Sequence, residues 1–415
     1  MRNAFIFENK NDVLFINILN PKQGDCIFLQ IPGNITGNTL RDREKKSKPE
    51  SEQESKSKSK HKYTNIIIDC TKNASKLFTK FIENYDIENR GIDLIIISHP
   101  HYDHFSGIES LLEHSKKNGI KSKIPEIWIT EYITDSISGE YYELLIDAQA
   151  ENQLKFPQFN DKITIENNES ITELRVIGPN NDLRGNFRVK LSEGDKFYKK
   201  VGFSKELTTD FYSIDKYNKN NTSLVMQLSF SRNNDQTNKN KENGKKKPFM
   251  AIFPGDLEET GWGKIENEEI EGCNLYKVSH HGSVNANPKD TIDILRPEYS
   301  IKTNNLSVKY KNIDEEGSIE TSIKNLEDSN CKEVYSIGSE KEEDIKNQEK
   351  ESEEASKNIK EFYNNELITF AIIPNIKRNE SVVIPMTYKD IGDIDKINIA
   401  NIRPLGRYKM AIKDK

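Results

Sequence analysis

Short apolar runs separated by polar bends open the chain. Two such runs, at residues 13–19 and 26–31, flank a polar stretch at 20–25 that contains proline, glycine, asparagine and aspartate. These residue types favour the tight bends that connect paired strands. The pattern therefore predicts a β-hairpin near the start of the chain.

Farther along, apolar runs of strand length alternate with segments whose apolar residues recur three and four positions apart. The first pattern predicts buried strands and the second predicts helices. Strands are expected at residues 65–69, 92–98, 124–133, 222–230, 249–253, 273–278, 297–301, 333–337 and 367–373. Helices are expected at residues 74–85, 108–114 and 319–326, whereas residues 183–220 follow neither pattern. Strands that alternate with helices indicate a layered α/β fold.

Polar stretches interrupt this pattern and hold the hydrophobic fraction of the chain to 34%. Residues 41–62 and 232–248 are polar inserts, and they are expected to be disordered loops because they cannot offset the entropy of ordering. Residues 340–362 form a charged segment with weak helical periodicity. We expect one large domain over residues 1–375 and a C-terminal extension over 376–415, made of added edge strands or a partner surface.

The balance of charge gives no global sign of attraction to nucleic acid or membrane. Lys and Arg number 61 against 67 Asp and Glu, for a net charge of -6. Any basic binding surface must therefore be regional. No segment reaches the roughly 18 apolar residues of a membrane span.

The four cysteines lie far apart and show no Cys-x-x-Cys spacing; they are Cys26, Cys70, Cys273 and Cys331. This spacing argues against both a structural zinc knuckle and a disulfide framework. The N-terminal residues show neither the sustained apolar core nor the small-residue cleavage site of a secretion signal. A cytoplasmic, unprocessed protein is the expectation.

Four metal-ligand side chains follow the strand expected at 92–98. His99, His101, Asp103 and His104 gather imidazole and carboxylate groups in a tight loop that can serve two adjacent ions. These ligands suit zinc and tolerate manganese or iron, and no thiolate lies nearby as in closed structural zinc sites. A surface loop that is rich in histidine by chance would need this spacing by accident. The motif therefore predicts an open, catalytic metal site.

Two later strand ends carry the same kinds of side chain. Asp256 follows a glycine just beyond the strand expected at 249–253, where one carboxylate can bridge two cations. His280 and His281 directly follow the strand expected at 273–278. Taken alone, Asp256 is as well explained as a turn residue, and the histidine pair is weak evidence. Both gain weight beside the first motif.

The order of these motifs resembles the metallo-β-lactamase superfamily. The matching segments are Gln23-Gly24-Asp25, Ile68-Asp69, the His99 to His104 motif, Asn221 to Val225, Gly255-Asp256 and Lys277 to Ser283. The His-His-Gly-Ser sequence more narrowly resembles the branch that includes the soluble hydrolase domain of ComEC-type DNA-uptake proteins and bacterial phosphorylcholine esterases. The resemblance implies an αββα sandwich with metal ions at one edge of its two sheets. It implies phosphoester substrates more often than β-lactams.

The resemblance also implies a ligand set for two divalent ions, Zn²⁺ or Mn²⁺. The expected ligands are His99 and His101 for the first ion, Asp103, His104 and His281 for the second, and Asp256 as the bridge. Asp103 and His280 are the expected catalytic residues, with His280 beside the substrate, and an exchange of roles between His280 and His281 stays open. Asp25 and Asp69 are expected behind the ligands, where a carboxylate fixes the tautomer of an imidazole.

One ligand is missing from this pattern. Many members of the superfamily have another histidine before the bridging aspartate, but none of the seven histidines lies between residues 115 and 279. His114 is expected to be exposed on a helix, and His61 falls in a polar insert. Asn221 or a water would have to complete the first ion's ligands. Weaker occupancy, or a preference for a harder ion such as Mn²⁺, follows.

Together these features predict a metal-dependent hydrolase whose nucleophile is a hydroxide shared by two ions. A phosphodiester is the expected substrate, as DNA, RNA or a cyclic nucleotide, and lysines between residues 239 and 247 give this weak support because such runs are usually solvated loops. One alternative is the hydrolysis of a carboxylic ester, lactone or thioester. Another is a metal-binding recognition subunit with a decayed site and a protein partner in a larger system. No membrane partner is expected.

Overall fold

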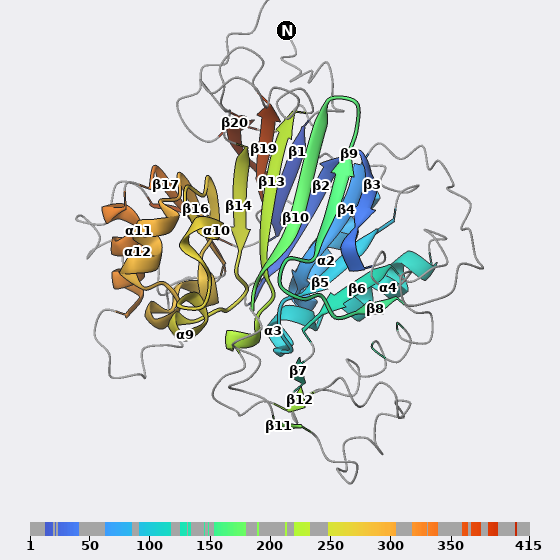
Figure 1. Cartoon of the computed structure of the whole chain (residues 1–415). Helices are drawn as coiled ribbons and strands as arrows, with labels where there is room; N and C mark the ends of the chain where they lie inside the picture. Colours follow the sequence, from blue (N-terminus) through green and yellow to red (C-terminus); the bar gives the residue numbers. More distant parts are fainter. Residues whose placement is uncertain are drawn as a thin grey trace, which may run out of the picture.

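The computed structural model describes two sheets and the helices that cover them (Figure 1). The described residues are 13–19, 21, 24–40, 63–84, 91–117, 125–130, 132–133, 145, 148, 153–179, 189–190, 212–213, 220–232, 248–303, 318–329, 331–338, 359–363, 367–374, 381–388 and 403–404. The polar inserts and most of the stretch 183–220 lie outside them.

The first sheet has nine strands within the described residues, in the order β21-β20-β19-β1-β2-β4-β5-β6-β8. They are β1 (Leu14–Leu19), β2 (Cys26–Pro32), β4 (Tyr63–Cys70), β5 (Leu94–Ile97), β6 (Glu126–Ile129), β8 (Leu154–Lys155), β19 (Leu367–Pro374), β20 (Ser381–Tyr388) and β21 (Arg403–Pro404). Strands β4, β5, β6 and β8 are parallel, and the others pair antiparallel. Every residue of β4 and β5 is buried, as expected of isoleucine-rich parallel strands with both faces covered.

The second sheet also has nine strands in the described part of the chain, in the order β18-β17-β16-β15-β14-β13-β10-β9-β3. They are β3 (Asn34–Asn38), β9 (Lys162–Glu166), β10 (Ser170–Gly178), β13 (Val225–Arg232), β14 (Phe249–Phe253), β15 (Leu275–Lys277), β16 (Tyr299–Thr303), β17 (Glu333–Gly338) and β18 (Ile359–Tyr363). A small third sheet joins β7 (Tyr132–Ile133), β11 (Val189–Lys190) and β12 (Tyr212–Ser213). Strands β14 to β18 are parallel, so their carboxyl ends share one edge.

Helices lie outside both sheets (Figure 1). The α-helices are α2 (Lys72–Asn84), α3 (Tyr102–Phe105), α4 (Ile108–Lys117), α9 (Glu259–Trp262), α10 (Asn267–Ile270), α11 (Lys289–Leu295) and α12 (Ser318–Asp328). Short 3₁₀ turns are η3 (Asn220–Thr222), η4 (Ser279–Gly282) and η5 (Val284–Ala286). Helices α2 and α4 cover the first sheet, and α11 and α12 cover the second.

Two apolar clusters hold these layers together. The larger cluster lies between the sheets and includes Ile68 of the first sheet and Phe253 of the second. The smaller cluster packs outward-facing residues of the second sheet, such as Ile252, against Leu295 and Leu326 of its helices. On the far side, the Phe28 ring meets that of Phe78 in α2 at 4.7 Å between centroids. The expected fold class, a layered α/β protein built as an αββα sandwich, is confirmed.

The hairpin expected at the start is confirmed, because β1 and β2 pair antiparallel. The antiparallel pair β9 and β10 was not expected from the sequence. In β10 the residue Ile171 is half-exposed and Thr172 is buried, so the apolar pattern does not follow the burial pattern. The charged segment that showed weak helical periodicity ends in a strand, β18, at residues 359–363.

The C-terminal extension contributes to the first sheet. Its strand β20 pairs with β19 and β21 pairs with β20, so both extend the sheet outward. The boundary near residue 375 stays a prediction. Among the described helices, none has the length and apolar content needed to cross a membrane.

Candidate metal centre

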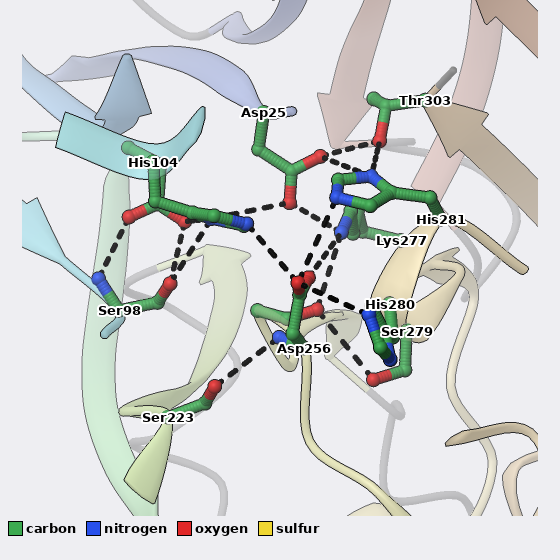
Figure 2. Close-up of polar contacts among 12 residues, drawn as sticks. Asp25, Ser98, His104, Ser223, Asp256, Lys277, Ser279, His280, His281 and Thr303 are labelled. Carbon is green, nitrogen blue, oxygen red and sulfur yellow. Dashed lines mark hydrogen bonds and ion pairs between the residues drawn. The ribbon is translucent and has the colours of Figure 1, made fainter. Parts of the chain in front are cut away.

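Polar side chains from both sheets meet at one edge of the sandwich (Figure 2). They stand at strand ends: Asp25 before β2, Asp69 in β4, Ser98 after β5, Asp256 after β14, Lys277 at the end of β15 and Thr303 at the end of β16. Ligands of open α/β sheets bind beyond the carboxyl ends of parallel strands. The topology therefore gathers here residues that are far apart in the sequence.

Two glycines allow the loop after β5 to lie against its neighbours. Gly24 has φ +95°, and a Cβ there would lie 2.0 Å from the carbonyl oxygen of Asp103. Gly255 has φ +60°, and a Cβ there would lie 2.8 Å from Ser98 Oγ. A side chain at either position would displace the loop. The two Gly-Asp sequences thus need their glycines for close backbone approach.

Asp69 fixes the orientation of His104 and, through Ser98, that of His99. Its Oδ2 lies 2.8 Å from His104 Nδ1 and accepts a hydrogen bond from Ser98 Oγ at 2.7 Å. An ionised carboxylate only accepts, so His104 carries its proton on Nδ1. Ser98 Oγ has donated its proton to Asp69 and can accept one from His99 Nδ1, 3.1 Å away. Both imidazoles therefore present Nε2 lone pairs to the centre.

Thr303 and Asp25 fix the orientation and the protonated nitrogen of His281. The Thr303 hydroxyl donates to Asp25 Oδ1 and lies 3.2 Å from His281 Nδ1. A hydroxyl has one proton to give, so Thr303 must accept the Nδ1 proton of His281. His281 then offers its Nε2 lone pair 3.5 Å from Asp103 Oδ2. All these residues except Asp103 are buried.

One oxygen of Asp256 is the point on which the imidazoles converge (Figure 2). Its Oδ2 lies 3.2 Å from His104 Nε2 and 3.7 Å from the Nε2 atoms of both His99 and His281. The Nε2 atom of His280 lies 3.8 Å away. Ligands of one ion at about 2.0–2.2 Å from it can stand at such separations. We call His99, His101, Asp103, His104, Asp256 and His281 the candidate metal centre.

The side of the centre expected to hold the first ion has fewer donors. His99 Nε2 lies 2.8 Å from His101 Nδ1. Two lone pairs can approach this closely only when a proton or a cation lies with them. Asn221, the expected substitute for a histidine, turns its Oδ1 away to accept from the backbone N–H groups of Glu258 at 3.1 Å and Gly261 at 3.0 Å. Its amide oxygen therefore stabilises the next turn.

The residues of the centre fit divalent ions. Within the described part of the chain, the buried Nε2 atoms of His104 and His281 have no hydrogen-bond partner. Their ligand atoms lie within 4.8 Å of each other and of Asp103. An unpartnered buried nitrogen is costly unless something binds it. Imidazole with carboxylate is the donor set of catalytic zinc sites and also suits manganese.

The charges of the cluster also favour the binding of cations. Burial alone would lower the pKa of His104, but the carboxylates of Asp256, Asp69 and Asp103 outweigh it and raise this pKa well above its ordinary value. Burial alone would raise the pKa of Asp256, but the neighbouring imidazoles, His104 foremost, hold it well below its usual range. Without ions, a proton on His104 balances the carboxylates. Cations would displace that proton.

His280 lies beside the centre and has its own carboxylate. Its Nδ1 is 3.4 Å from Glu258 Oε1, which also accepts a hydrogen bond from Asn220 Nδ2 at 2.8 Å. Burial lowers the pKa of His280, but Asp256 and the hydrogen bond to Glu258 outweigh burial and raise it. The side chain of His280 is 20% exposed, against 3% for His281. His280 is therefore the histidine of the pair that a substrate can reach.

The backbone is strained where it carries this pair. His280 has φ 44° and His281 has φ 53°, and Gly282 follows with φ +93°. Non-glycine residues seldom adopt the left-handed region, and each such residue costs of order 1–3 kcal/mol. This turn aims the two neighbouring imidazoles at Asp256 from different directions.

All six expected ligands and both expected catalytic residues meet at this edge. His114 belongs to α4, and His61 and the lysines at 239–247 fall outside the described residues. No sequence pattern predicted a role for Thr303, Glu258 or Asn220. Lys277 was part of a motif but had no assigned function.

Comparisons with known proteins add distant likenesses. A protein-family model described as "Anti-Pycsar protein Apyc1" matches residues 58–234. The match spans less than half of the chain; it includes the first motif and ends before Asp256. No curated protein matches the chain.

Three solved structures share low similarity with the chain. Yeast long-form RNase Z is 13% identical over 79% of this chain and 40% of its own, with a TM-score of 0.35. A diphosphatase of the PhnP family is 10% identical, covering 87% of this chain and 99% of its own, with a TM-score of 0.32. The short form of human tRNase Z is 10% identical, covering 77% of this chain and 92% of its own, with a TM-score of 0.28. Likenesses this distant assign neither activity nor substrate.

Proposed function

We propose that the protein is a metal-dependent phosphodiester hydrolase with two divalent ions, Zn²⁺ or Mn²⁺. The observation that carries this proposal is the convergence of four imidazoles on Asp256 Oδ2, with the Nε2 atoms of His104 and His281 buried and unpartnered among the described residues. A structural role alone does not explain buried donors that face one another across a carboxylate.

The proposed assignment of ligands is the one that the family resemblance implies, and the distances between donor atoms are compatible with it. His99 and His101 would bind the first ion, and Asp103, His104 and His281 the second. Asp256 would serve both. The other nitrogen of each buried ligand histidine already has an acceptor, which leaves its Nε2 atom for metal.

Two divalent ions bound here would lower the pKa of a shared water and hold a phosphate oxygen, which suits in-line displacement at phosphorus. The protein's own contribution is at His280. Burial disfavours the imidazolium, but Asp256 and Glu258 outweigh burial and raise the pKa of His280. With Glu258 accepting from Nδ1, the protonated ring carries its second proton on Nε2, beside the reaction centre. This proton can pass to the departing alkoxide oxygen. Asp103, 28% exposed, lies at the open side of the centre and holds His281 in place.

A phosphodiester substrate, as nucleic acid or a nucleotide, is supported by two features. A proton donor beside a two-ion site suits an alkoxide leaving group, which departs poorly without protonation. The Lys277 to Ser283 motif resembles the ComEC-type and phosphorylcholine esterase branch.

The test is hydrolysis by the purified chain with Mn²⁺ or Zn²⁺. The substrates are bis(p-nitrophenyl) phosphate, single- and double-stranded DNA, RNA and a chromogenic lactone. We expect phosphodiester cleavage that the His101→Ala/Asp103→Ala double variant loses. The control variant His114→Ala, which changes a histidine of α4 that is not a proposed ligand, should retain it. Equal turnover by the double variant, or turnover of the lactone alone, would refute the proposal.

A further inference from the structure

Lys277 carries a buried ammonium group into the wall of the candidate metal centre. Its side chain is 1% exposed at the end of β15. Its Nζ forms an ion pair with Asp25 Oδ2, donates to the Gly255 carbonyl oxygen at 3.2 Å and lies 3.9 Å from Asp256 Oδ1 (Figure 2). A buried charge persists only when other groups compensate it. Lys277 is therefore a fixed cation within a cluster of carboxylates.

The two oxygens of Asp256 face different partners. Its Oδ2 faces the imidazoles of the centre, as described above, whereas its Oδ1 lies on the side of Lys277. Oδ1 has no hydrogen-bond partner among the described residues, so the ammonium is the charge that orients it. Rotation of the carboxylate would move Oδ1 away from that ammonium, inside a site where water does not compensate for the loss.

We propose that Lys277 is a positioning residue that restricts Asp256 to offering Oδ2 alone, so that one oxygen serves both ions. The inference rests on the proposed function in that it requires two ions in the centre. Without Lys277, Asp256 would be free to turn both oxygens toward a single ion. That ion would then be held well, while the other ion would lose its share of the bridge.

A purely structural role predicts something different. Lys277 also pairs with Asp25, and Asp25 accepts from Thr303, so the loss of Lys277 alone would leave a buried carboxylate without its counterion. The double variant Asp25→Asn/Lys277→Met removes both charges and so removes this penalty. If Lys277 only neutralises Asp25, the double variant will bind metal as the single variant Asp25→Asn does.

The experiment is a titration of chelator-treated protein with Mn²⁺, followed by calorimetry and by the electron paramagnetic resonance spectrum of the ions. The proteins are the wild type, Asp25→Asn, Asp25→Asn/Lys277→Met and Lys332→Met, the last a matched change at a lysine that is 58% exposed. In the wild type and Lys332→Met, we expect two bound ions that are spin-coupled through their bridge. In Asp25→Asn we expect the ions to stay coupled, with a loss of affinity for the ion that His281 binds, because Asp25 accepts from the Thr303 hydroxyl behind His281. In the double variant we expect the more weakly bound of the two ions to lose at least a further tenfold in affinity relative to Asp25→Asn, and the coupling to disappear.

If the double variant binds two spin-coupled ions with the same affinities as Asp25→Asn, the inference is overturned and the proposed function stands. A wild type that binds no Mn²⁺ or Zn²⁺ would instead overturn the proposed function. If the double variant does not fold, a crystal structure of the Mn²⁺-loaded wild type decides. Asp256 Oδ2 bonded to both ions with Oδ1 toward Lys277 supports the inference, and Oδ1 bonded to either ion contradicts it.

Discussion

The two sides of the candidate metal centre, one for each proposed ion, differ in how well their ligand histidines are buried and oriented. On the second-ion side, His104 and His281 are buried and each has a fixed acceptor behind it, Asp69 or Thr303. On the first-ion side, His101 is only partly buried, and the described residues place no third histidine there. Affinity for a metal ion depends on the groups that orient a ligand side chain as much as on the ligand itself. The difference between the two sides predicts two ions of unequal affinity.

The largest effect is expected from Asp256→Asn, because Asp256 Oδ2 faces His99 on one side and His104 and His281 on the other. The amide keeps the shape of the side chain but loses the charge that four imidazoles face. Affinity for both ions should fall by more than the roughly 10–100-fold typical of changes to outer groups. Calorimetric titration measures this, and the matched change Asp293→Asn on the exposed surface of α11 should leave binding unchanged. Retention of both ions would remove Asp256 from the centre.

The variants His104→Ala and His101→Ala should each abolish the binding of a different ion. His104→Ala removes a ligand that faces both Asp256 and Asp103, so the tightly bound ion should be lost. His101→Ala should abolish only the weak binding event and spare the tight one. Metal content after exhaustive dialysis distinguishes the two variants. Identical metal content in both would contradict the inequality of the sides.

A smaller and selective effect is expected from Thr303→Val. Valine keeps the volume but leaves His281 Nδ1 and Asp25 Oδ1 without the hydroxyl that joins them. We expect the tight site to weaken by about 10–100-fold, with the weak site changed little. Thr36→Val, at an exposed position in β3, is the matched control for titration. A loss confined to the weak site would reverse our assignment of His281.

The smallest effect is a change in how stability depends on pH. The pKa of His104 is raised in the folded protein, so protonation of His104 stabilises the folded state. This stabilisation is complete below the ordinary histidine pKa of about 6.5 and is lost as pH rises through the raised pKa. Metal-free protein should therefore unfold at a lower temperature at about pH 8.5 than at about pH 6. Ions replace this proton and bind more tightly as it leaves, so stabilisation by Mn²⁺ should grow over the same range.

Thermal unfolding with EDTA and with Mn²⁺, at both pH values, measures the two trends. The pKa of Asp256 is lowered, so its contribution is lost only as pH falls through that lowered value, well outside this range. If the unfolding temperature depends on pH in the same way with and without metal, protons and metal ions do not compete at His104.

The sequence could predict the ligands because they cluster in short motifs directly after buried strands. Hydrophobic runs located β5, β14 and β15, and the residues beyond each run had to lie at strand ends. Neither Thr303 nor Glu258 had such a signal, since a lone threonine or glutamate has many roles. Only the parallel pairing of β15 with β16 brings Thr303 behind His281.

Lys277 shows a different limit of sequence reasoning. It stood within a recognised motif, but lysine at a strand end is usually solvated. The facing Asp25 comes from the other sheet, more than 250 positions away in the chain, so local pattern could not reveal the ion pair. Asn221 failed as a substitute ligand for a related reason. The turn that occupies its amide oxygen forms only when η3 packs against α9.

The presence of two unequal ions in the centre can be measured by calorimetric titration of chelator-treated wild-type protein with Mn²⁺, repeated with Zn²⁺. We expect two ions per chain whose affinities differ by at least about tenfold, the scale on which orienting groups act. Two equally tight ions would contradict the unequal supply of ligands, and no binding of either metal would contradict the metal centre itself.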